Sequence, residues 1–315
     1  MSETNVTPPS PPTSAASAPQ ISVVVVTYNH ARYIVRAIES VLAQETGRLL
    51  EIIVSEDAST DGTRRIVEDL AARDPRIRLL LSERNLRSNE VVARAIRAAR
   101  GEYLCILDGD DFWIARDKLE RQAAELDGDP AASACFHNAA IVHDDDEQAG
   151  DECWTPPTQP KRLGKADIWR GNPFATCAGM LRRSALQDLG PWYADFFPIT
   201  DWPLYVLCAM HGDLKFVDEV VGAYRLHDGG LFSSRPGADK LRMTSRFYSR
   251  MKSVVDARNR KLAARGGAHY FLEWAQEYAH AGQRRLQRLC LWYAARAGVL
   301  HKGFPWRLWL KAAMA

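Results

Sequence analysis

Runs of apolar residues alternate with amphipathic segments along the first 115 residues of the chain. Continuous apolar runs of four to six residues are typical of parallel strands that are buried on both faces. Between them, Ile34, Ile38 and Val41 recur at helical spacing. The alternation predicts an α/β fold with a mostly parallel, Rossmann-like open sheet flanked by helices. The predicted strands cover residues 21–26, 51–54, 77–81 and 103–107.

A polar cluster follows each of the four predicted strands. In chain order the clusters are TYN, SEDAS, SERN and DGDD. Parallel strands place their carboxyl ends at one edge of the sheet, and open α/β sheets bind ligands at that edge. The clusters should therefore meet in one crevice. The residues brought together there are Asn29, Asp57, Arg84, Asp108 and Asp110.

Three aspartates directly follow the fourth predicted strand. They are Asp108, Asp110 and Asp111, with Gly109 inside their turn. Like charges this close raise one another's pKa unless a counter-charge is present. A hard divalent cation with oxygen ligands, Mn²⁺ or Mg²⁺, supplies such a charge. The alternative is a solvated acidic turn.

The usual dinucleotide fingerprint is missing after the first predicted strand. No G-x-G-x-x-G motif occurs there. The sequence therefore argues against an NAD-dependent enzyme. If the ligand carries phosphates, the sequence favours a metal ion as the group that holds them, and not the N-terminus of a helix that follows a glycine-rich loop.

The second half of the chain has a less regular pattern. It predicts strands at 134–136, 139–142, 174–181, 214–217 and 220–225, a short helix at 184–189, and a helix within 199–212 that Thr200 or Asp201 caps. From residue 236 the pattern is helical to the end. We expect a disordered tail at 1–20, one domain at 21–235 with halves at 21–143 and 144–235, and a helical C-terminal extension at 236–315.

Composition narrows the function classes. The 315 residues are 46% hydrophobic and 25% charged with a net charge of +2, which is ordinary for a globular protein and does not suggest a nucleic-acid binder. The six cysteines are scattered, which argues against a zinc site or disulfide framework and fits a reducing cytosol. No apolar run reaches the ~18 residues of a membrane span, and no signal sequence begins the chain. These features predict a cytoplasmic protein.

The end of the chain is basic and rich in tryptophan. Glu277 is the last acidic residue. Basic, tryptophan-bearing amphipathic helices lie on anionic membrane surfaces, so peripheral contact with the inner face of the cell membrane is one expectation. The alternative is a pair of packed helices with a solvated basic face. The residues concerned are Arg284, Arg285, Arg288, Arg296, Lys302, Arg307, Lys311, Trp292, Trp306 and Trp309.

Four sequence blocks occur in the order of a known enzyme family. They are VVVVTYNHARYIVRAIESVLAQ, IIVSEDASTDGT, GEYLCILDGDDFW and YRLHDGG. On these blocks, roughly residues 21–234 resemble a family-two glycosyltransferase with the type-A nucleotide-sugar fold. GDDFW followed by KLERQ and CFHNA is similar to a bacterial subgroup associated with capsule, lipopolysaccharide or other surface polysaccharides. The resemblance implies that 21–143 binds the nucleotide sugar and 144–235 binds the acceptor.

The resemblance implies roles for residues that would contact the nucleotide. Thr27, Tyr28 and Asn29 would line the nucleoside pocket. Asp57 would accept a hydrogen bond from the base, which is uracil N3 if the donor is a UDP-sugar. Arg84 lies near the position of a further nucleotide contact. A simple turn role for Asp57 stays open.

It also implies a metal site and a catalytic base. Asp108 would contact the ribose or the metal, and Asp110 would hold the metal on the diphosphate. His227 lies in a block that reaches back toward the diphosphate and metal. Asp201 falls at the position of the general base. Structural roles also stay open for Asp201, as a helix cap, and for His227, as a loop histidine.

The chain departs from the family pattern in places. Arg87 stands where glycine is usual, and Thr200 replaces the glutamate that usually precedes the base. The Q-x-x-R-W block of processive polysaccharide synthases is absent, and so are their membrane spans. This absence favours the addition of one sugar at a time.

The resemblance predicts an inverting, metal-dependent transfer of one sugar from a nucleotide-diphosphate sugar. A UDP-sugar is favoured as donor, and the acceptor is a hydroxyl of a glycan or lipid-linked molecule in surface polysaccharide or lipopolysaccharide biosynthesis. One alternative is a sugar-nucleotide pyrophosphorylase, although its glycine- and basic-rich N-terminal loop is not found. The other is a catalytically inactive nucleotide-sugar-binding protein.

Overall fold

A computed structural model describes residues 20–144, 150, 152–298 and 306–314. The expected disordered tail at 1–20 lies outside the described residues except for Gln20. Within the described part of the chain, nine strands form one mixed sheet. The strands are β1 (Ile21–Thr27), β2 (Leu50–Glu56), β3 (Ile77–Leu81), β4 (Tyr103–Asp108), β5 (Phe112–Trp113), β6 (Ala132–His143), β7 (Arg162–Leu163), β8 (Gly179–Arg182) and β9 (Asp213–Leu226).

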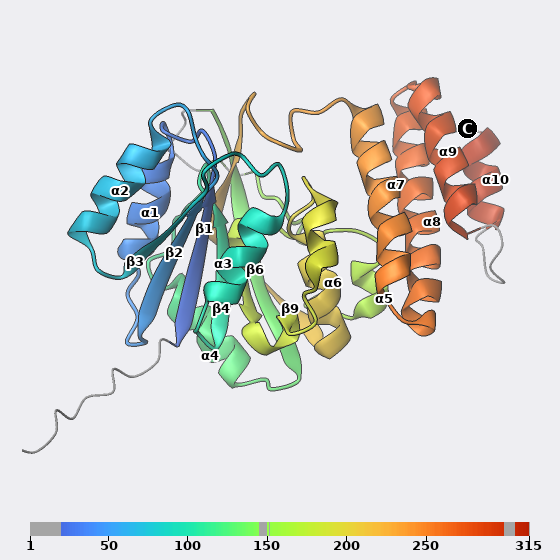
Figure 1. Cartoon of the computed structure of the whole chain (residues 1–315). Helices are drawn as coiled ribbons and strands as arrows, with labels where there is room; N and C mark the ends of the chain where they lie inside the picture. The colour runs from blue at the N-terminus through green and yellow to red at the C-terminus, as the bar shows by residue number, and fades with distance from the viewer. Residues whose placement is uncertain (1–19, 145–149, 151, 299–305, 315) are drawn as a thin grey trace, which may run out of the picture.

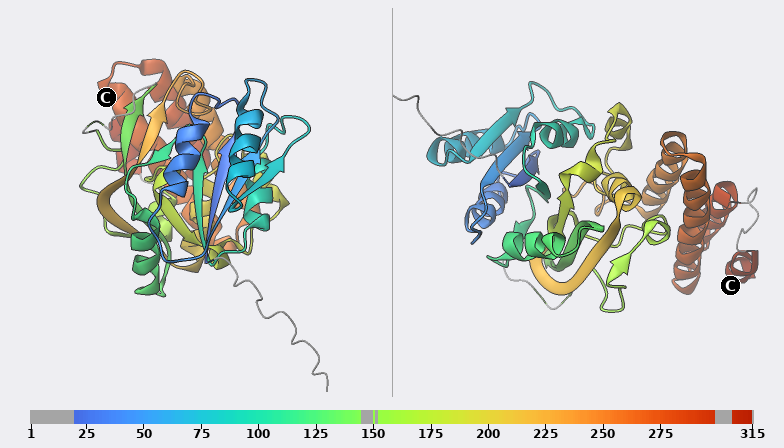
Figure 2. Two further views of the ribbon diagram at one scale, coloured as in Figure 1. Left: turned by 90° about the vertical axis from the view of Figure 1, so that its left-hand side faces the viewer. Right: turned by 90° about the horizontal axis from the view of Figure 1, so that it is seen from below.

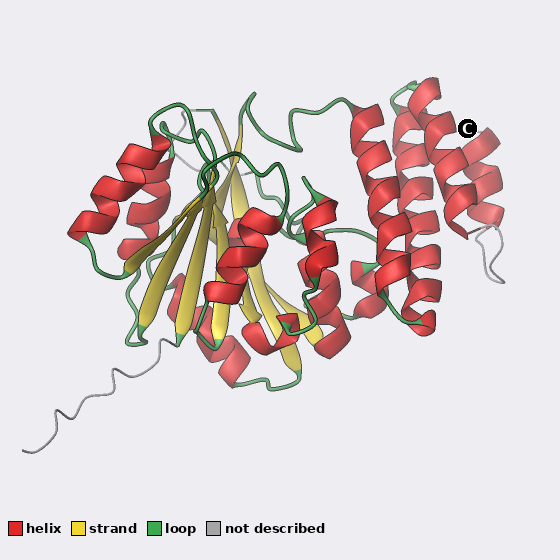
Figure 3. Cartoon of the chain, in the orientation of Figure 1, coloured by secondary structure: helices red, strands yellow, loops and turns green. Residues whose placement is uncertain are grey.

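The helices surround and extend this sheet (Figures 1 and 3). The α-helices are α1 (Ile34–Leu42), α2 (Thr63–Arg73), α3 (Glu90–Ala98), α4 (Lys118–Asp127), α5 (Lys165–Ile168), α6 (Trp202–His211), α7 (Gly237–Val254), α8 (Ala257–His280), α9 (Arg284–Gly298) and α10 (Trp306–Met314). Three short 3-10 helices are η1 (Thr176–Ala178), η2 (Arg183–Leu186) and η3 (Pro191–Phe196) in the described ranges.

The strand order is β3-β2-β1-β4-β8-β6-β9-β5, and β7 pairs with β9. The first four strands are parallel, and they confirm the four strands predicted from the apolar runs. Strand β8 runs antiparallel to both β4 and β6, and β6 is parallel to β9. The result is the expected mostly parallel open sheet flanked by helices.

Two apolar layers cover the faces of the parallel strands. On one face, alternate side chains of β1 and β2 pack against α1, α2 and α4, with Val23, Ile38 and Leu119 fully buried. On the other face, Val24 and Ile106 pack against α3 and α6. Burial on both faces explains why these strands are continuous apolar runs instead of alternating ones. The sheet is therefore a rigid platform for the loops at its edge.

The second half was predicted less accurately. The segments at 134–136 and 139–142 are one strand, β6, with bulges near His137 and Asn138. The segments at 214–217 and 220–225 are likewise one strand, β9. The strand expected at 174–181 begins only at Gly179, after η1, and the helix expected at 184–189 is the 3-10 helix η2. Bulges keep polar residues inside a strand, and periodicity does not detect them.

The C-terminal helices form a bundle at one end of the molecule, beyond α6 (Figures 1 and 2). They confirm the helical extension. The indole of Trp202 on α6 stacks on Phe247 of α7, with ring centroids 4.3 Å apart. Tyr248 also donates a 2.8 Å hydrogen bond from its hydroxyl to the carbonyl of Trp169. In the described residues, no helix is both long and apolar enough to cross a membrane.

Candidate functional site

The carboxyl ends of β1, β2, β3 and β4 lie at one edge of the sheet, as expected. The register pairs Thr27 with Glu56, Glu56 with Leu81, and Val26 with Asp108. The four polar clusters therefore leave the sheet side by side. Figure 1 shows the loops that follow these strands gathered at its upper edge.

The turn after β4 requires glycine. The amide of Gly109 donates a 2.8 Å hydrogen bond to the carbonyl of Val26, which draws the turn against β1. A Cβ atom at Gly109 would lie 2.8 Å from Thr27 Oγ1 and 2.9 Å from His30 Nδ1. Such contacts are too short for any other residue without movement of β1. Glycine therefore lets Asp108 and Asp110 lie close to Thr27 and His30.

Asp110 lies between two histidines. Its Oδ2 is 2.9 Å from His227 Nε2 and 3.7 Å from His30 Nε2. Burial raises the pKa of Asp110, but the two histidines and the hydrogen bond from His227 outweigh this effect and hold the pKa below its ordinary value. Asp110 is therefore ionised near neutral pH, as a cation ligand must be.

Asp108 has the opposite electrostatic environment. Burial, followed by the charges of Asp110 and Asp201, raises the pKa of Asp108 to about 8. Asp201 is distant from Asp108 in the sequence, yet its charge contributes to the raised pKa of Asp108. Asp201 also lines a small cavity together with Ile106, which lies on β4 two residues before Asp108.

Asp111, the third aspartate, belongs to the scaffold. Its side chain is 1% exposed, and its Oδ1 accepts a 2.8 Å hydrogen bond from the backbone N–H of Arg225. Burial and the charges of Asp110 and Asp108 raise its pKa well above the ordinary value. The Arg225 guanidinium also donates to the carbonyl of Asp110 at 2.9 Å. Asp111 and Arg225 thus attach the turn to β9, and β9 leads directly to His227.

These residues fit a cation that is shared with a substrate. Among the described residues, no group of three or more His, Cys, Asp or Glu side chains is arranged to hold a metal ion. Mg²⁺ and similar ions are often bound by one or two carboxylates together with substrate phosphates and water. Asp110 and Asp108 meet that requirement, with His227 beside them. Thr27 Oγ1 and His30 Nδ1, next to the same turn, are buried polar atoms without a hydrogen-bond partner.

The residues expected to contact the nucleoside lie at the ends of β1 and β2. Asp57 is 6% exposed, and its Oδ1 accepts 3.0 Å hydrogen bonds from Ser82 Oγ and from the backbone N–H of Leu86. Asn29 has a positive φ of 55°, and its Oδ1 accepts a 2.8 Å hydrogen bond from the Thr60 amide. Tyr28 beside it is half-buried. The β1 and β2 loops are therefore fastened together.

The Arg84 side chain is exposed after β3, at the rim of the crevice. Arg94, on α3, lies deeper. It donates to Ser55 Oγ at 2.9 Å and to the carbonyls of Glu56 and Leu80 at 3.0 and 2.8 Å. Arg94 joins β2 and β3 where they end. It therefore supports the loop that carries Asp57.

Asp201 lies at the N-terminus of α6. Its Oδ1 accepts a 2.7 Å hydrogen bond from the Trp202 amide, and its Oδ2 accepts one of the same length from Asn172 Nδ2. Burial raises the pKa of Asp201, and these hydrogen bonds oppose the increase. Asp201 is thus a helix cap, as one of the sequence alternatives held. The capping role is compatible with chemistry because each carboxylate oxygen has a second lone pair.

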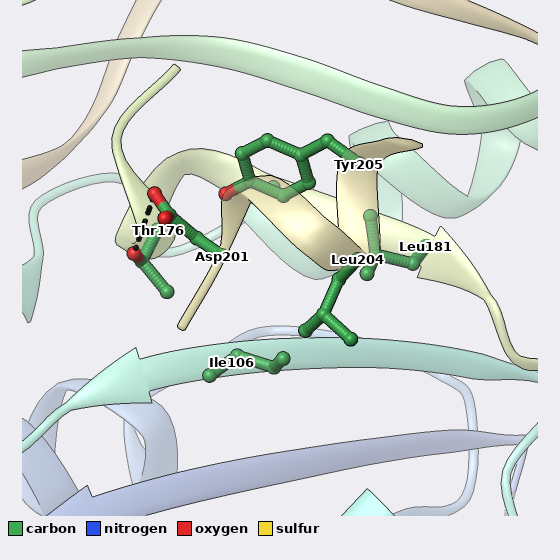
Figure 4. Close-up of a pocket in the computed structure, with 7 residues that line it drawn as sticks. Ile106, Thr176, Leu181, Asp201, Leu204 and Tyr205 are labelled. Carbon is green, nitrogen blue, oxygen red and sulfur yellow. Dashed lines mark hydrogen bonds between the residues drawn. The ribbon is translucent and has the colours of Figure 1, made fainter. Parts of the chain in front are cut away.

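Apolar side chains lie behind Asp201. Figure 4 shows Asp201 beside the hydroxyls of Thr176 and Tyr205, with Ile106, Leu181 and Leu204 on the other side of a small cavity. The Thr176 hydroxyl is 3.5 Å from Asp201 Oδ2. Exclusion of water on this side explains the desolvation of the carboxylate. The base candidate therefore faces the crevice from an apolar wall.

Several residues around the site were not predicted from the sequence. His30 directly follows the Thr-Tyr-Asn cluster, so its position was a usable signal. Arg225 lies near the end of β9, two positions before His227, inside the YRLHDGG block that already marked His227. Asn172 and Thr176 lie in an irregular segment before β8, where no periodicity or motif marks them.

An open α/β sheet with a carboxylate turn at the carboxyl ends of its parallel strands has the architecture of a ligand-binding enzyme domain. The glycosyl transferase family 2 model matches residues 22–190. The chain belongs to this family, and the predicted resemblance is confirmed.

Sequence relatives agree with this assignment. The uncharacterized protein Rv1520 of Mycobacterium tuberculosis is 34% identical over 215 residues, which is 68% of this chain and 61% of that protein. The chain thus spans less than two thirds of the length of this relative. The succinoglycan biosynthesis protein ExoO of Rhizobium meliloti is 40% identical over 131 residues, 42% of this chain and 36% of that protein.

Solved structures share the fold. Staphylococcus aureus TarS 1–349, in complex with UDP-GlcNAc, has 18% identity and a TM-score of 0.64, covering 92% of this chain and 82% of that chain. The mannosyltransferase PcManGT of Pyrobaculum calidifontis, with GDP-Man and Mn²⁺, has 22% identity and a TM-score of 0.61, covering 95% and 81%. The expected type-A glycosyltransferase fold is confirmed.

The scaffold role of Asp111 can be tested by substitution. Asp111→Asn retains the Oδ1 acceptor for the Arg225 amide, so we expect normal folding and nucleotide binding within a few-fold of wild type. Asp111→Ala leaves the buried N–H unpaired and should lower the free energy of unfolding by about 1–3 kcal/mol. Chemical denaturation and calorimetry measure the two quantities. If Asp111→Asn folded normally but bound nucleotide much more weakly than wild type, Asp111 would be a residue of the binding site and not of the scaffold.

Proposed function

We propose that this chain is an inverting glycosyltransferase that moves one sugar from a nucleotide-diphosphate sugar to an acceptor hydroxyl. The observation that carries the proposal is the pair of unlike carboxylates in one crevice. Two histidines keep Asp110 ionised, and Asp201 is partly buried at the N-terminus of α6 with a raised pKa. A cation ligand must be ionised, as Asp110 is. A general base works best when its pKa is near the working pH, and the raised pKa of Asp201 suits that role.

In this proposal the donor lies across the ends of β1, β2 and β4. Thr27, Tyr28 and Asn29 line the nucleoside pocket. Asp57 has lone pairs beyond those used by Ser82 and Leu86, and one of them accepts the base N–H, which favours a uracil. Arg84, at the exposed rim, makes a further contact with the nucleotide. UDP-GlcNAc in the TarS structure is consistent with a UDP-sugar donor.

Asp110 and Asp108 hold a divalent cation, Mn²⁺ or Mg²⁺, on the diphosphate, with His227 beside it. When bound, the cation neutralises the charge that develops on the leaving diphosphate. Asp201 accepts the proton of the acceptor hydroxyl as its oxygen attacks the anomeric carbon from the face opposite the diphosphate. The configuration at that carbon is therefore inverted. Mn²⁺ in the PcManGT structure supports the choice of ion.

The two halves of the catalytic domain bind different substrates in this scheme. Residues 21–143 bind the donor and 144–235 the acceptor, while 236–315 form the extension. The acceptor is a glycan or lipid-linked molecule of surface polysaccharide or lipopolysaccharide biosynthesis, and the succinoglycan role in the name of ExoO supports this class. Such a reaction is expected in the cytoplasm, at the inner face of the cell membrane.

The C-terminal extension has a surface suited to that location. On α9, Arg285, Arg288, Trp292 and Arg296 are exposed at spacings of three and four residues, so they form one stripe. Trp292 is 53% exposed, and the Arg296 guanidinium lies 5.3 Å from its ring centroid. The printed sequence has no acidic residue after Glu277. Exposed tryptophan among arginines favours contact with anionic lipid headgroups.

Calorimetry tests the donor site first. We expect one of UDP, GDP, dTDP and CMP, with UDP favoured, to bind more tightly with Mn²⁺ than without it. Asp110→Ala should weaken that binding by more than about tenfold and remove the effect of Mn²⁺, since even residues behind the ligands are worth 10–100-fold. Asp69→Ala, on the exposed face of α2, is the matched control. Binding that ignores both Mn²⁺ and Asp110 would refute the cation site.

Turnover tests the base. With a donor and acceptor panel, Asp201→Asn should lower kcat by about 10²–10⁴-fold, the usual contribution of a general base, with unchanged nucleotide affinity. Asp69→Asn is the control. If Asp201→Asn keeps more than about a tenth of the wild-type rate, Asp201 is only a helix cap. Nucleotide binding without turnover on the whole panel would identify an inactive binding protein.

Vesicle sedimentation tests the membrane surface. The protein should bind vesicles rich in phosphatidylglycerol and not neutral phosphatidylcholine vesicles. Arg285→Glu with Arg288→Glu should weaken binding at least about 30-fold, from roughly 1 kcal/mol per basic residue. Arg65→Glu with Arg73→Glu makes the same charge change on α2, at the opposite end of the molecule in Figure 1. If both double substitutions weakened vesicle binding equally, net charge, and not the stripe on α9, would govern binding.

A further inference from the structure

Asn172 makes the shortest side-chain contact on the base candidate. Its Nδ2 donates a 2.7 Å hydrogen bond to Asp201 Oδ2. The Thr176 hydroxyl approaches the same oxygen only to 3.5 Å, and Oδ1 is occupied by the Trp202 amide. Asn172 therefore determines how the second carboxylate oxygen is oriented.

The backbone around Asn172 is held by packing. Asn172 precedes Pro173, which restricts its backbone to extended conformations. The Pro173 carbonyl accepts a 2.9 Å hydrogen bond from Thr155 Oγ1. Phe174 is fully buried and stacks on Phe136, with centroids 4.1 Å apart. The amide thus reaches Asp201 from a fixed position and loses little freedom in doing so.

The orientation of the Asn172 amide fits an ionised partner. Its Oδ1 is buried and has no hydrogen-bond partner, an arrangement that costs stability. Rotating the amide by half a turn would place Oδ1 against the carboxylate, which is repulsive while Asp201 is charged. A protonated Asp201 could donate to that oxygen instead. A hydrogen bond donated by Nδ2 therefore stabilises the charged form of Asp201.

In the part of the chain that the structure describes, the other groups around Asp201 supply no positive charge. The titratable groups that face it are Asp108 at the end of β4, Tyr193 on η3, Tyr205 on α6 and Tyr224 on β9. Asp108 is acidic, and the tyrosines are neutral at ordinary pH. Hydrogen-bond donors must therefore offset the burial of the carboxylate. The two short hydrogen bonds to Asp201 are donated by Asn172 Nδ2 and by the Trp202 amide.

We propose that Asn172 is a positioning residue of the transfer reaction, which orients Asp201 and favours the form that can accept the acceptor's proton. The inference rests on the proposed role of Asp201 as general base. Asn172 itself is not a catalytic residue in this scheme, because it acts through the carboxylate.

The pH profile of kcat/KM tests this role. Asn172→Leu removes the donor at similar volume, so the ionised form of Asp201 loses a hydrogen bond and its pKa rises. The acidic limb should move to higher pH by about one to two units, with UDP affinity unchanged. Asn172→Ala, which only shortens the side chain, should give the same shift if leucine does not fit. If the acidic limb of the kcat/KM profile lies at the same pH in Asn172→Leu as in wild type, the inference is overturned, even if kcat/KM itself falls.

A second measurement does not depend on turnover. At low pH Asp201 is protonated in both proteins, so the difference in melting temperature between wild type and Asn172→Leu should be smallest there. As the pH rises through the Asp201 pKa, only wild type retains the hydrogen bond to the charged form, and the difference should widen. In a protein that already carries Asp201→Asn, the change in melting temperature caused by Asn172→Leu should not depend on pH.

Thr155→Val is the matched structural control. It releases the loop behind Asn172 but keeps the amide, so its melting difference should not depend on pH. A pH-independent difference for Asn172→Leu overturns the inference. If wild type transfers no sugar, the proposed function fails, while the melting experiment still decides the coupling between Asn172 and Asp201.

Discussion

The desolvation of carboxylates is the constraint that shapes this structure. Asp111 is buried and Asp108, Asp110 and Asp201 are partly buried, and burial by itself raises the pKa of each. The chain meets this cost differently at each position. Asp110 has two histidines, Asp201 has a helix N-terminus and an amide, and Asp111 has the backbone N–H of Arg225. The pKa of Asp108 is raised to about 8, so a bound cation would lower this pKa and favour the charged form of Asp108.

The same constraint explains why distant segments converge. A turn with three acids cannot stay compact unless its neighbours supply donors or positive charge. Here β9 supplies Arg225, the segment directly after β9 supplies His227, and the loop after β1 supplies His30. Gly109 makes the approach possible because any Cβ would strike Thr27 and His30. The crevice is therefore built from β1, β4 and β9 together.

The sequence predicted the parts of this arrangement that periodicity and topology control. Four continuous apolar runs became β1 to β4, and parallel pairing placed Asn29, Asp57 and Asp108 at one edge as expected. The roles within the acidic turn could not be separated, because Asp110 and Asp111 differ only in what lies opposite them. Asn172 was invisible for the same reason. It owes its contact to a bulged, irregular half of the fold, where no repeat fixes which side chain faces Asp201.

The helix α6 connects the base to the C-terminal extension. Its residues from Trp202 to Ala209 are buried almost all round, with the sheet on one side and α7 on the other. Trp202, next to Asp201 in the chain, stacks on Phe247 and donates its indole N–H to the carbonyl of Ile168 at 2.8 Å. The carboxylate is thus held from both directions. The extension is therefore part of what positions Asp201, because removing it would expose the face of α6 that Phe247 covers.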